Sequence, residues 1–241
     1  MTNNLFYQYY DSLFQAKDYK GETDLIFELT KKFGISSPKK ILEIGCGTGN
    51  HTKVLAEKGI DLVAIDNDQE MIRLAKDKLK ENDKLKIIYT DIEDLKEDNF
   101  DLTLAMFNVV TYISETSQLN SFIKAVYQRL NSGGIFVFDC WNGIAAIKDP
   151  PQTKKTEVLD NGEKIEFTLT PTTDFFNQKT TLKYDFKDSS FSFDQTLWTP
   201  MQISDSLRQA GFETILCSPL IDIDKKATDK DWKIMFVAKK N

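Results

Sequence analysis

Three glycines at alternate positions mark the stretch of this chain best suited to bind a ligand. Gly45, Gly47 and Gly49 follow the short apolar run 41–44 and precede a segment with helical spacing. Glycine lets the backbone turn tightly and approach a ligand closely, so a strand, a glycine turn and a helix are typical of a nucleotide-type cofactor loop. Because the strand and the helix that this motif requires are present, we interpret it as a binding loop and not as a bare turn.

The spacing of these glycines distinguishes between cofactors. A dinucleotide fingerprint reads G-x-G-x-x-G, with pyrophosphate at the helix N-terminus. Here the third glycine comes one position earlier, and Glu43 stands two residues before the first glycine. A carboxylate at that point would repel pyrophosphate but would suit an ammonium or sulfonium group. The pattern therefore favours a cationic cofactor over the alternative, a nucleotide-cofactor oxidoreductase.

Acidic residues also follow the next two apolar runs. Asp66 comes directly after 62–65, and Asp91 lies two residues after 85–89. Ligands of doubly wound sheets bind outside the carboxyl ends of the strands, where an acidic side chain can accept hydrogen bonds from ribose hydroxyls. The alternative for Asp66 is a surface carboxylate that caps the helix starting near Gln69.

These residues make the chain resemble the class I S-adenosylmethionine (SAM)-dependent methyltransferases. The stretch 42–49, L-E-I-G-C-G-T-G, looks like the first motif of that family, and Asp66 matches the second motif in place and setting. The segment 10–19, Y-D-S-L-F-Q-A-K-D-Y, resembles the N-terminal lid of small-molecule members. The resemblance implies SAM as the cofactor.

The resemblance also implies roles for particular residues. Asp91 would accept a hydrogen bond from the adenine amine, Met71 would pack on the adenine face, and a lid tyrosine would help to hold the methionine end of SAM. We interpret Phe6 and Phe14, in the same aromatic-rich segment, as packing residues. The cofactor-binding residues that we expect are Tyr10, Tyr19, Glu43, Gly45, Cys46, Gly47, Asp66, Asn67, Met71, Asp91, Ile92, Met106 and Phe107.

Two parts of the chain differ in their hydrophobic pattern. Residues 1–151 and 198–241 alternate apolar runs with helical periods, and the resemblance implies an α/β Rossmann-like doubly wound sheet of seven strands, the last antiparallel. Residues 152–197 alternate in the manner of strands, and Asn161-Gly162 is a hairpin signal, which predicts three or four inserted antiparallel strands. So short an insert seldom folds alone, so we expect an acceptor lid or a homodimer surface.

The acceptor is harder to predict than the cofactor. Methyl transfer displaces an already activated sulfonium carbon, so the protein mainly aligns the acceptor and excludes water. An unprotonated amine needs no strong base, and we interpret the single histidine, His51, as a helix residue and not as a catalyst. We expect Tyr112, Asp139 and Trp141 to orient the acceptor.

Within the family, the strand end 138–141, Pro150-Pro151 and the insert most resemble N-methyltransferases of nucleotide-linked amino sugars. Many of those carry H-x-M-R in the last insert strand, where this chain has T-L-W-T at 196–199. The resemblance implies a small-molecule amine as substrate. The alternatives are an O- or C-methyltransferase, with Asp139, Tyr112 or an insert carboxylate as base, and a non-catalytic SAM-binding protein.

Composition limits the partners. The net charge is −6 and arginine occurs only at Arg73, Arg129 and Arg208, which argues against a nucleic-acid surface. No apolar run approaches the ~18 residues of a membrane span, and the first residues lack the features of a signal peptide. The three cysteines are far apart, without metal-ligand spacing. We therefore expect a cytoplasmic protein with reduced thiols, no metal and no membrane contact.

Overall fold

The core of the protein is a seven-stranded sheet, seen here in a computed structural model that describes residues 4–35, 37–220 and 222–241. β11 runs antiparallel to both of its neighbours, and the remaining core pairs are parallel. The predicted fold class is therefore confirmed. In spatial order the strands are β10 (Phe212–Pro219), β11 (Lys233–Lys240), β5 (Leu130–Trp141), β4 (Phe100–Ala105), β1 (Lys40–Ile44), β2 (Asp61–Asp66) and β3 (Leu85–Tyr89).

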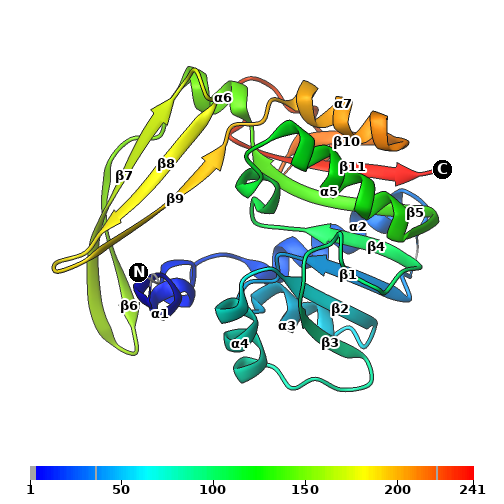
Figure 1. Cartoon of the computed structure of the whole chain (residues 1–241), viewed down its shortest axis with the longest axis horizontal. Coiled ribbons are helices and arrows are strands. Elements are labelled where there is room, and N and C mark those ends of the chain that lie inside the picture. The colour runs from blue at the N-terminus through cyan, green and yellow to red at the C-terminus, as the bar shows by residue number, and fades with distance from the viewer. Residues whose placement is uncertain (1–3, 36, 221) are drawn as a thin grey trace.

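Helices cover both faces of this sheet (Figure 1). Successive strand residues point to opposite faces, so Ile41 belongs to one buried cluster and Leu42 to the other. The first cluster contains residues of α2 (Tyr19–Lys32), α3 (Asn50–Ala56) and α4 (Gln69–Lys78). The second contains residues of α5 (Thr116–Arg129) and α7 (Pro200–Ala210). Because helices cover both faces of the sheet, the side chains on both faces of each strand are apolar. The buried strands are therefore continuous apolar runs in the sequence.

The order of the strands fixes the place of the ligand. The chain moves outward from β1 to β2 and β3, and then returns to the other side of β1 with β4. A crevice forms where the strand order reverses, outside the carboxyl ends of β1 and β4. The 3₁₀ helix η1 (Val109–Tyr112) lies directly beyond β4 at this edge.

The insert forms a second, antiparallel sheet of four strands: β6 (Lys154–Asp160), β7 (Glu163–Asp174), β8 (Lys179–Asp185) and β9 (Ser190–Thr196). Asn161 and Gly162 both have positive φ, as the predicted type I′ hairpin requires. The buried cluster of this sheet includes Phe167 and Tyr184 and packs against α1 (Asn4–Leu13). The N-terminal helix therefore lies between the insert and the core (Figure 1).

The sequence analysis missed two features of the fold. The short helix α6 (Gly143–Lys148), between the core and the insert, was not predicted. The stretch 131–134, N-S-G-G, is typical of a turn, but β5 already starts at Leu130, which pairs with Phe100 before the register shifts. Gly133 has a φ of 77° within this irregular stretch, so the strand continues through what reads in sequence as a turn. Among the described residues, no helix is both long and apolar enough to cross a membrane.

The start of α7 offers a test of local stability. Thr199 Oγ1 accepts a hydrogen bond from the Gln202 backbone amide at 3.3 Å, and Gln202 Oε1 accepts one from the Thr199 amide at 2.9 Å. Losing such a cap lowers stability by about 1 kcal/mol. We expect Thr199→Ala to reduce the free energy of unfolding by this amount in urea titrations. Thr199→Ser keeps the hydroxyl and should lose little, so equal losses in both variants would contradict the capping role.

Candidate functional site

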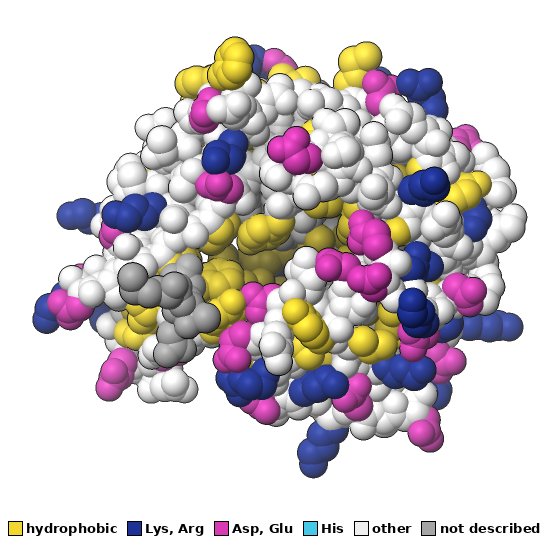
Figure 2. Space-filling model, in the orientation of Figure 1, with side chains coloured by type: hydrophobic (Ala, Val, Ile, Leu, Met, Phe, Trp, Pro, Cys, Tyr) yellow, Lys and Arg dark blue, Asp and Glu magenta, His cyan; other side chains and the backbone are white. Residues whose placement is uncertain are grey.

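A cavity of about 700 Å³ lies where the strand order reverses, and we call it the switch-point cavity. It receives residues from the glycine loop, from the ends of β2, β3 and β4, and from α1. Figure 2 shows the hollow, with hydrophobic side chains inside it and acidic side chains near its rim. The expected cofactor residues that line it are Tyr10, Gly45, Gly47, Asp66, Asn67, Met71, Asp91, Ile92, Met106 and Phe107.

The glycine loop needs its glycines for both conformation and space. Gly45 has a φ of 68° and Gly47 a φ of 54°, in the left-handed region that other residues avoid. A Cβ atom on Gly45 would lie 2.6 Å from Cγ2 of Val109. The loop is therefore held close to η1, and its backbone forms one wall of the cavity.

Asp66 connects the end of β2 to this loop. Its carboxylate accepts hydrogen bonds from the Gly47 amide at 2.8 Å and the Asp68 amide at 2.9 Å. Burial raises the pKa of Asp66, and these two bonds oppose that shift. A carboxylate has about four lone-pair sites, so capacity remains for ribose hydroxyls.

The alternative role for Asp66 belongs to another residue. Asp68 is the N-cap of α4, and its Oδ1 accepts hydrogen bonds from the amides of Glu70 and Met71. The other oxygen of Asp68 accepts one from the Tyr7 hydroxyl at 2.6 Å. Asp66 is therefore not needed as the helix cap.

The charge of the switch-point cavity fits the expected cofactor. Its described lining contains no lysine or arginine, and its carboxylates are Asp66, Asp68, Asp91, Glu93 and Asp94. SAM carries a sulfonium and an ammonium group against one carboxylate, so this lining attracts it, whereas it would repel a pyrophosphate. Asp91 Oδ1 accepts a hydrogen bond from Asn67 at 2.9 Å, which orients that carboxylate at the cavity.

Three expected cofactor residues do not line this cavity. Glu43 lies beneath the site, 3% exposed, where Thr52 Oγ1 donates a hydrogen bond to it at 2.7 Å. Burial raises the pKa of Glu43 to about 7. Cys46 is a residue of the glycine loop but is buried, and the Tyr19 hydroxyl accepts a hydrogen bond from Asn50 at 3.4 Å. The expectation of a direct cofactor contact by Glu43, Cys46 or Tyr19 is therefore not supported by this geometry.

A second cavity, of about 790 Å³, lies between the core and the insert, and we call it the junction cavity. It shares Tyr10, Phe107 and Tyr112 with the switch-point cavity, so the two spaces adjoin. Much of its wall is aromatic: Phe14, Trp141, Tyr184, Phe193 and Trp232. A cleft with a largely apolar wall beside a cofactor site is the usual setting for a small-molecule substrate.

The carboxylates that line the junction cavity already have partners. Glu22 contacts Lys17 Nζ, and its Oε2 lies 3.0 Å from His51 Nε2. Burial opposes the ionisation of Glu22, but the bonds from His51 and Lys17 hold its pKa below the ordinary value. Asp18 accepts a hydrogen bond from the Gly21 amide, and Asp231 accepts two from Thr228. His51 is a buried residue of α3, and its contact with Glu22 was not expected.

The expected acceptor residues take different positions. Tyr112 lines both cavities and Trp141 lines the junction cavity. Asp139 lines neither: it is 1% exposed, and its Oδ1 accepts hydrogen bonds from the amides of Phe107 and, at 3.2 Å, Asn108. Those two residues have φ values of 71° and 63°, so Asp139 holds a strained turn that reaches both cavities. This differs from the expected contact between Asp139 and the acceptor.

The sequence analysis also missed the position of two aromatic residues, one on α1 and one directly after it. Phe6 lines the switch-point cavity and Phe14 lines the junction cavity, whereas both were interpreted as packing residues. Side chains four residues apart share a helix face. The spacing of Phe6, Tyr10 and Phe14 was therefore a signal that all three face the site.

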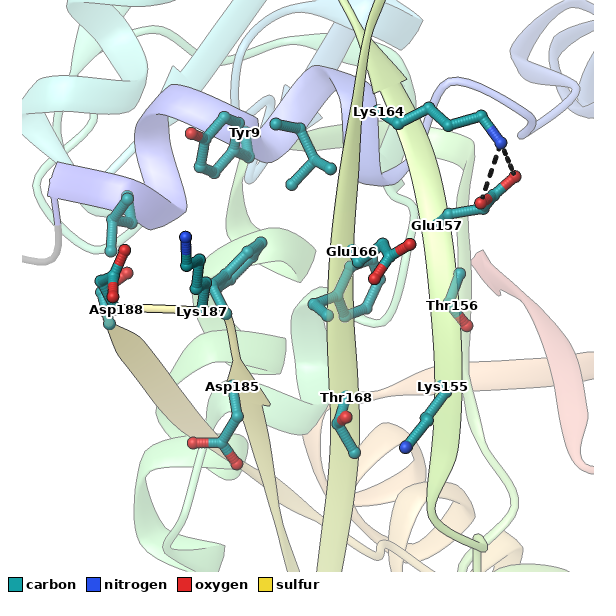
Figure 3. A pocket seen from close by; sticks show the side chains of 15 residues that line it. Tyr9, Lys155, Thr156, Glu157, Lys164, Glu166, Thr168, Asp185, Lys187 and Asp188 are labelled. Carbon is teal, nitrogen blue, oxygen red and sulfur yellow. Dashed lines mark hydrogen bonds and ion pairs between the residues drawn. The ribbon is translucent and has the colours of Figure 1, made fainter.

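A third cavity, of about 960 Å³, is an open groove away from these two. It lies beside a different face of α1, between Tyr9 and strands β6 and β7 (Figure 3). Its rim carries the ion pair between Lys164 and Glu157, at 3.0 Å. None of the expected site residues lines it, so we exclude it as the candidate site.

Comparison with known proteins agrees with this geometry. Residues 41–134 match the family described as the methyltransferase domain. Over the full length of both chains, the protein is 24% identical to a putative methyltransferase of Geobacillus sp. (strain WCH70). A SAM-dependent methyltransferase of Clostridium acetobutylicum shares the fold with a TM-score of 0.82 at 22% identity, over 99% of this chain and 98% of that one. SAM-bound CalS10, an amino pentose methyltransferase of Micromonospora echinaspora, gives a TM-score of 0.74 at 17% identity, over the whole of both chains.

Proposed function

We propose that this chain is a class I SAM-dependent methyltransferase and that it transfers the methyl group to a small-molecule amine. The methyltransferase-domain match over residues 41–134 and the full-length methyltransferase relative support this assignment. When bound, SAM supplies a methyl group on a positively charged sulfur, which is already activated for displacement. The protein then has to bind both molecules, align them and exclude water. The remaining question is which acceptor atom this site can serve.

One observation carries the proposal: the described lining of the junction cavity has no histidine, and each of its carboxylates already has a hydrogen-bond or ion-pair partner. Its carboxylates are held by Lys17, His51 and nearby backbone or hydroxyl groups. Desolvation by the surrounding residues raises the pKa of Tyr112 to about 12, although the residue is 53% exposed, and burial raises the pKa values of Tyr10 and Tyr184. These phenols therefore stay protonated at neutral pH. A hydroxyl or carbon acceptor would need a base, whereas an amine brings its own lone pair.

In this proposal the residues shared by the two cavities align the reaction. Tyr10 and Phe107 border both spaces, so they separate the cofactor from the acceptor except where the two molecules meet. Tyr112 contacts the acceptor side, with its ring centroid 5.7 Å from that of Phe193 in the insert. Asp139 acts indirectly, by holding the turn that carries Phe107.

We propose that the insert is the acceptor-side wall of the site. β8 contributes Leu182 and Tyr184 to the junction cavity, and β9 contributes Phe193 and Gln195. Without these strands the cavity would be open, and water would reach the acceptor. The alternative expectation of a homodimer formed through the insert stays a prediction.

An amino sugar is the acceptor class to test first. The full-length likeness to an amino pentose methyltransferase supports this choice, as do the aromatic walls, on which sugar rings can stack. The test pairs each amino sugar with the sugar that has a hydroxyl in place of the amine, and follows products by mass spectrometry in the presence of SAM. We expect methylated amines and unmodified hydroxyl counterparts. Methylation of the hydroxyl sugars, or SAM binding without turnover of any acceptor, would contradict the proposal.

A further inference from the structure

Two amide side chains beside the junction cavity have an oxygen without a hydrogen-bond partner. Asn108 Oδ1 and Gln195 Oε1 are buried and unpaired, and the two residues are 4% and 5% exposed. Leaving such a group unpaired destabilises a protein by about 1–3 kcal/mol, and native proteins contain few of them. Both residues line the junction cavity, so a ligand held there offers an explanation.

The position of these amides separates them from other unpaired groups. The other buried side chains of the described residues with an unpaired polar atom do not line any of the three cavities: Thr103, Asn120, Arg129 and Ser218. Asn108 lies in the turn between β4 and η1, and Gln195 lies on β9 of the insert, but both reach one cavity. An incidental packing defect does not account for this convergence.

The surroundings of each amide hold it at the cavity. Asn108 has a φ of 63°, in the turn fixed by Asp139. Gln195 is on β9, and the ring centroid of Phe193, two residues before it on the same strand, lies 5.7 Å from that of Tyr112. Residues two apart on a strand point to the same face, so Gln195 faces the cavity together with Phe193.

We propose that Asn108 and Gln195 recognise the acceptor, and that their amide oxygens accept hydrogen bonds from its N–H or O–H groups. This inference rests on the proposed function, because it assigns the junction cavity to the acceptor. An amine that donates its hydrogens to these oxygens keeps its lone pair for the methyl group. The lone pair forms the N–C bond, the electron pair of the C–S bond returns to sulfur, and the ammonium product releases its proton to water.

The test removes each amide and keeps the backbone intact. Asn108→Gly suits a φ of 63°, which glycine adopts freely, and Gln195→Met is similar in length and shape. With 3-amino-3-deoxyglucose as the acceptor, we expect either change to raise KM roughly tenfold or more, with the SAM dissociation constant unchanged. Asn108→Asp and Gln195→Glu restore an oxygen and should recover part of the loss. Asn120→Leu removes an unpaired amide outside the cavities and should leave KM as in the wild type.

A second measurement separates recognition from a structural role. Removing an unpaired oxygen should not destabilise the fold, so Gln195→Met should melt at the wild-type temperature or above it. An unchanged KM in both variants, or a clear drop in the melting temperature of Gln195→Met, would overturn the assignment.

The outcomes also distinguish this inference from the proposed function. If the wild type methylates hydroxyl sugars and not amines, the amine proposal fails. The same variants are then measured with the hydroxyl sugar, whose O–H groups would donate to the same oxygens. If the wild type methylates amines and the variants keep its KM, the amine proposal stands and the role of Asn108 and Gln195 fails.

Discussion

Asp66→Ala should weaken SAM binding roughly 10- to 100-fold while the fold persists. The side chain lines the switch-point cavity and is fixed by the amides of Gly47 and Asp68. A hydrogen bond to a charged group contributes about 1.5–3 kcal/mol, and the substitution leaves ribose hydroxyls unpaired in a buried site. Titration calorimetry with SAM measures the change directly.

A matched control lies at the other end of the same strand. Asp61 begins β2, is exposed and is remote from the cavity, so Asp61→Ala should bind SAM as the wild type does. Circular dichroism of both variants checks that β2 remains folded. Wild-type affinity in a folded Asp66→Ala protein would remove the ribose assignment.

Glu43→Gln should make the protein more stable than the wild type at pH 8, by a margin that disappears on acidification. Burial raises the folded-state pKa of Glu43 from 4.5 to about 7. The contribution of this group is therefore fully present below pH 4.5 and is lost as the pH rises through 7. A shift of this size corresponds to roughly 3 kcal/mol. Glutamine does not titrate, and its oxygen can still accept the hydrogen bond from Thr52.

The measurement is the difference in unfolding free energy between Glu43→Gln and the wild type, taken in urea from pH 5 to pH 8. Other carboxyl groups with a raised pKa, such as Asp66 and Asp139, are present in both proteins, so their contributions cancel in the difference. The control is Glu28→Gln, because Glu28 is an exposed carboxylate of α2. A difference that stays constant with pH would show that the pKa of Glu43 is not raised in the folded protein.

The sequence was sufficient to predict that the expected cofactor residues after three strands gather at one cavity. Parallel strands place their carboxyl ends at one edge of a sheet, so residues after successive apolar runs must come together there. Gly45 follows β1, Asp66 ends β2 and Asp91 follows β3, and all three line the switch-point cavity. The antiparallel insert was also predictable, because alternation and a hairpin signal are local properties.

Side-chain direction and long-range contacts were not predictable from motifs. Glu43 and Ile44 are neighbours on β1 and face opposite sides of the sheet, so Ile44 lines the cavity and Glu43 does not. Asp139 stands at a strand end, but the turn at Phe107 and Asn108 covers its carboxylate. Gln195 reaches the site only because the insert folds back over η1, which no spacing in the sequence encodes.

The central claim, that the acceptor is an amine aligned without a protein base, is tested most directly by the pH dependence of kcat/KM. Two amino sugars whose amine pKa values differ by about one unit should be compared under identical conditions. We expect the rising limb of the profile to move with the pKa of the substrate, because only the free amine reacts. A limb that stays at the same pH for both substrates would place the controlling proton on the enzyme and contradict the account.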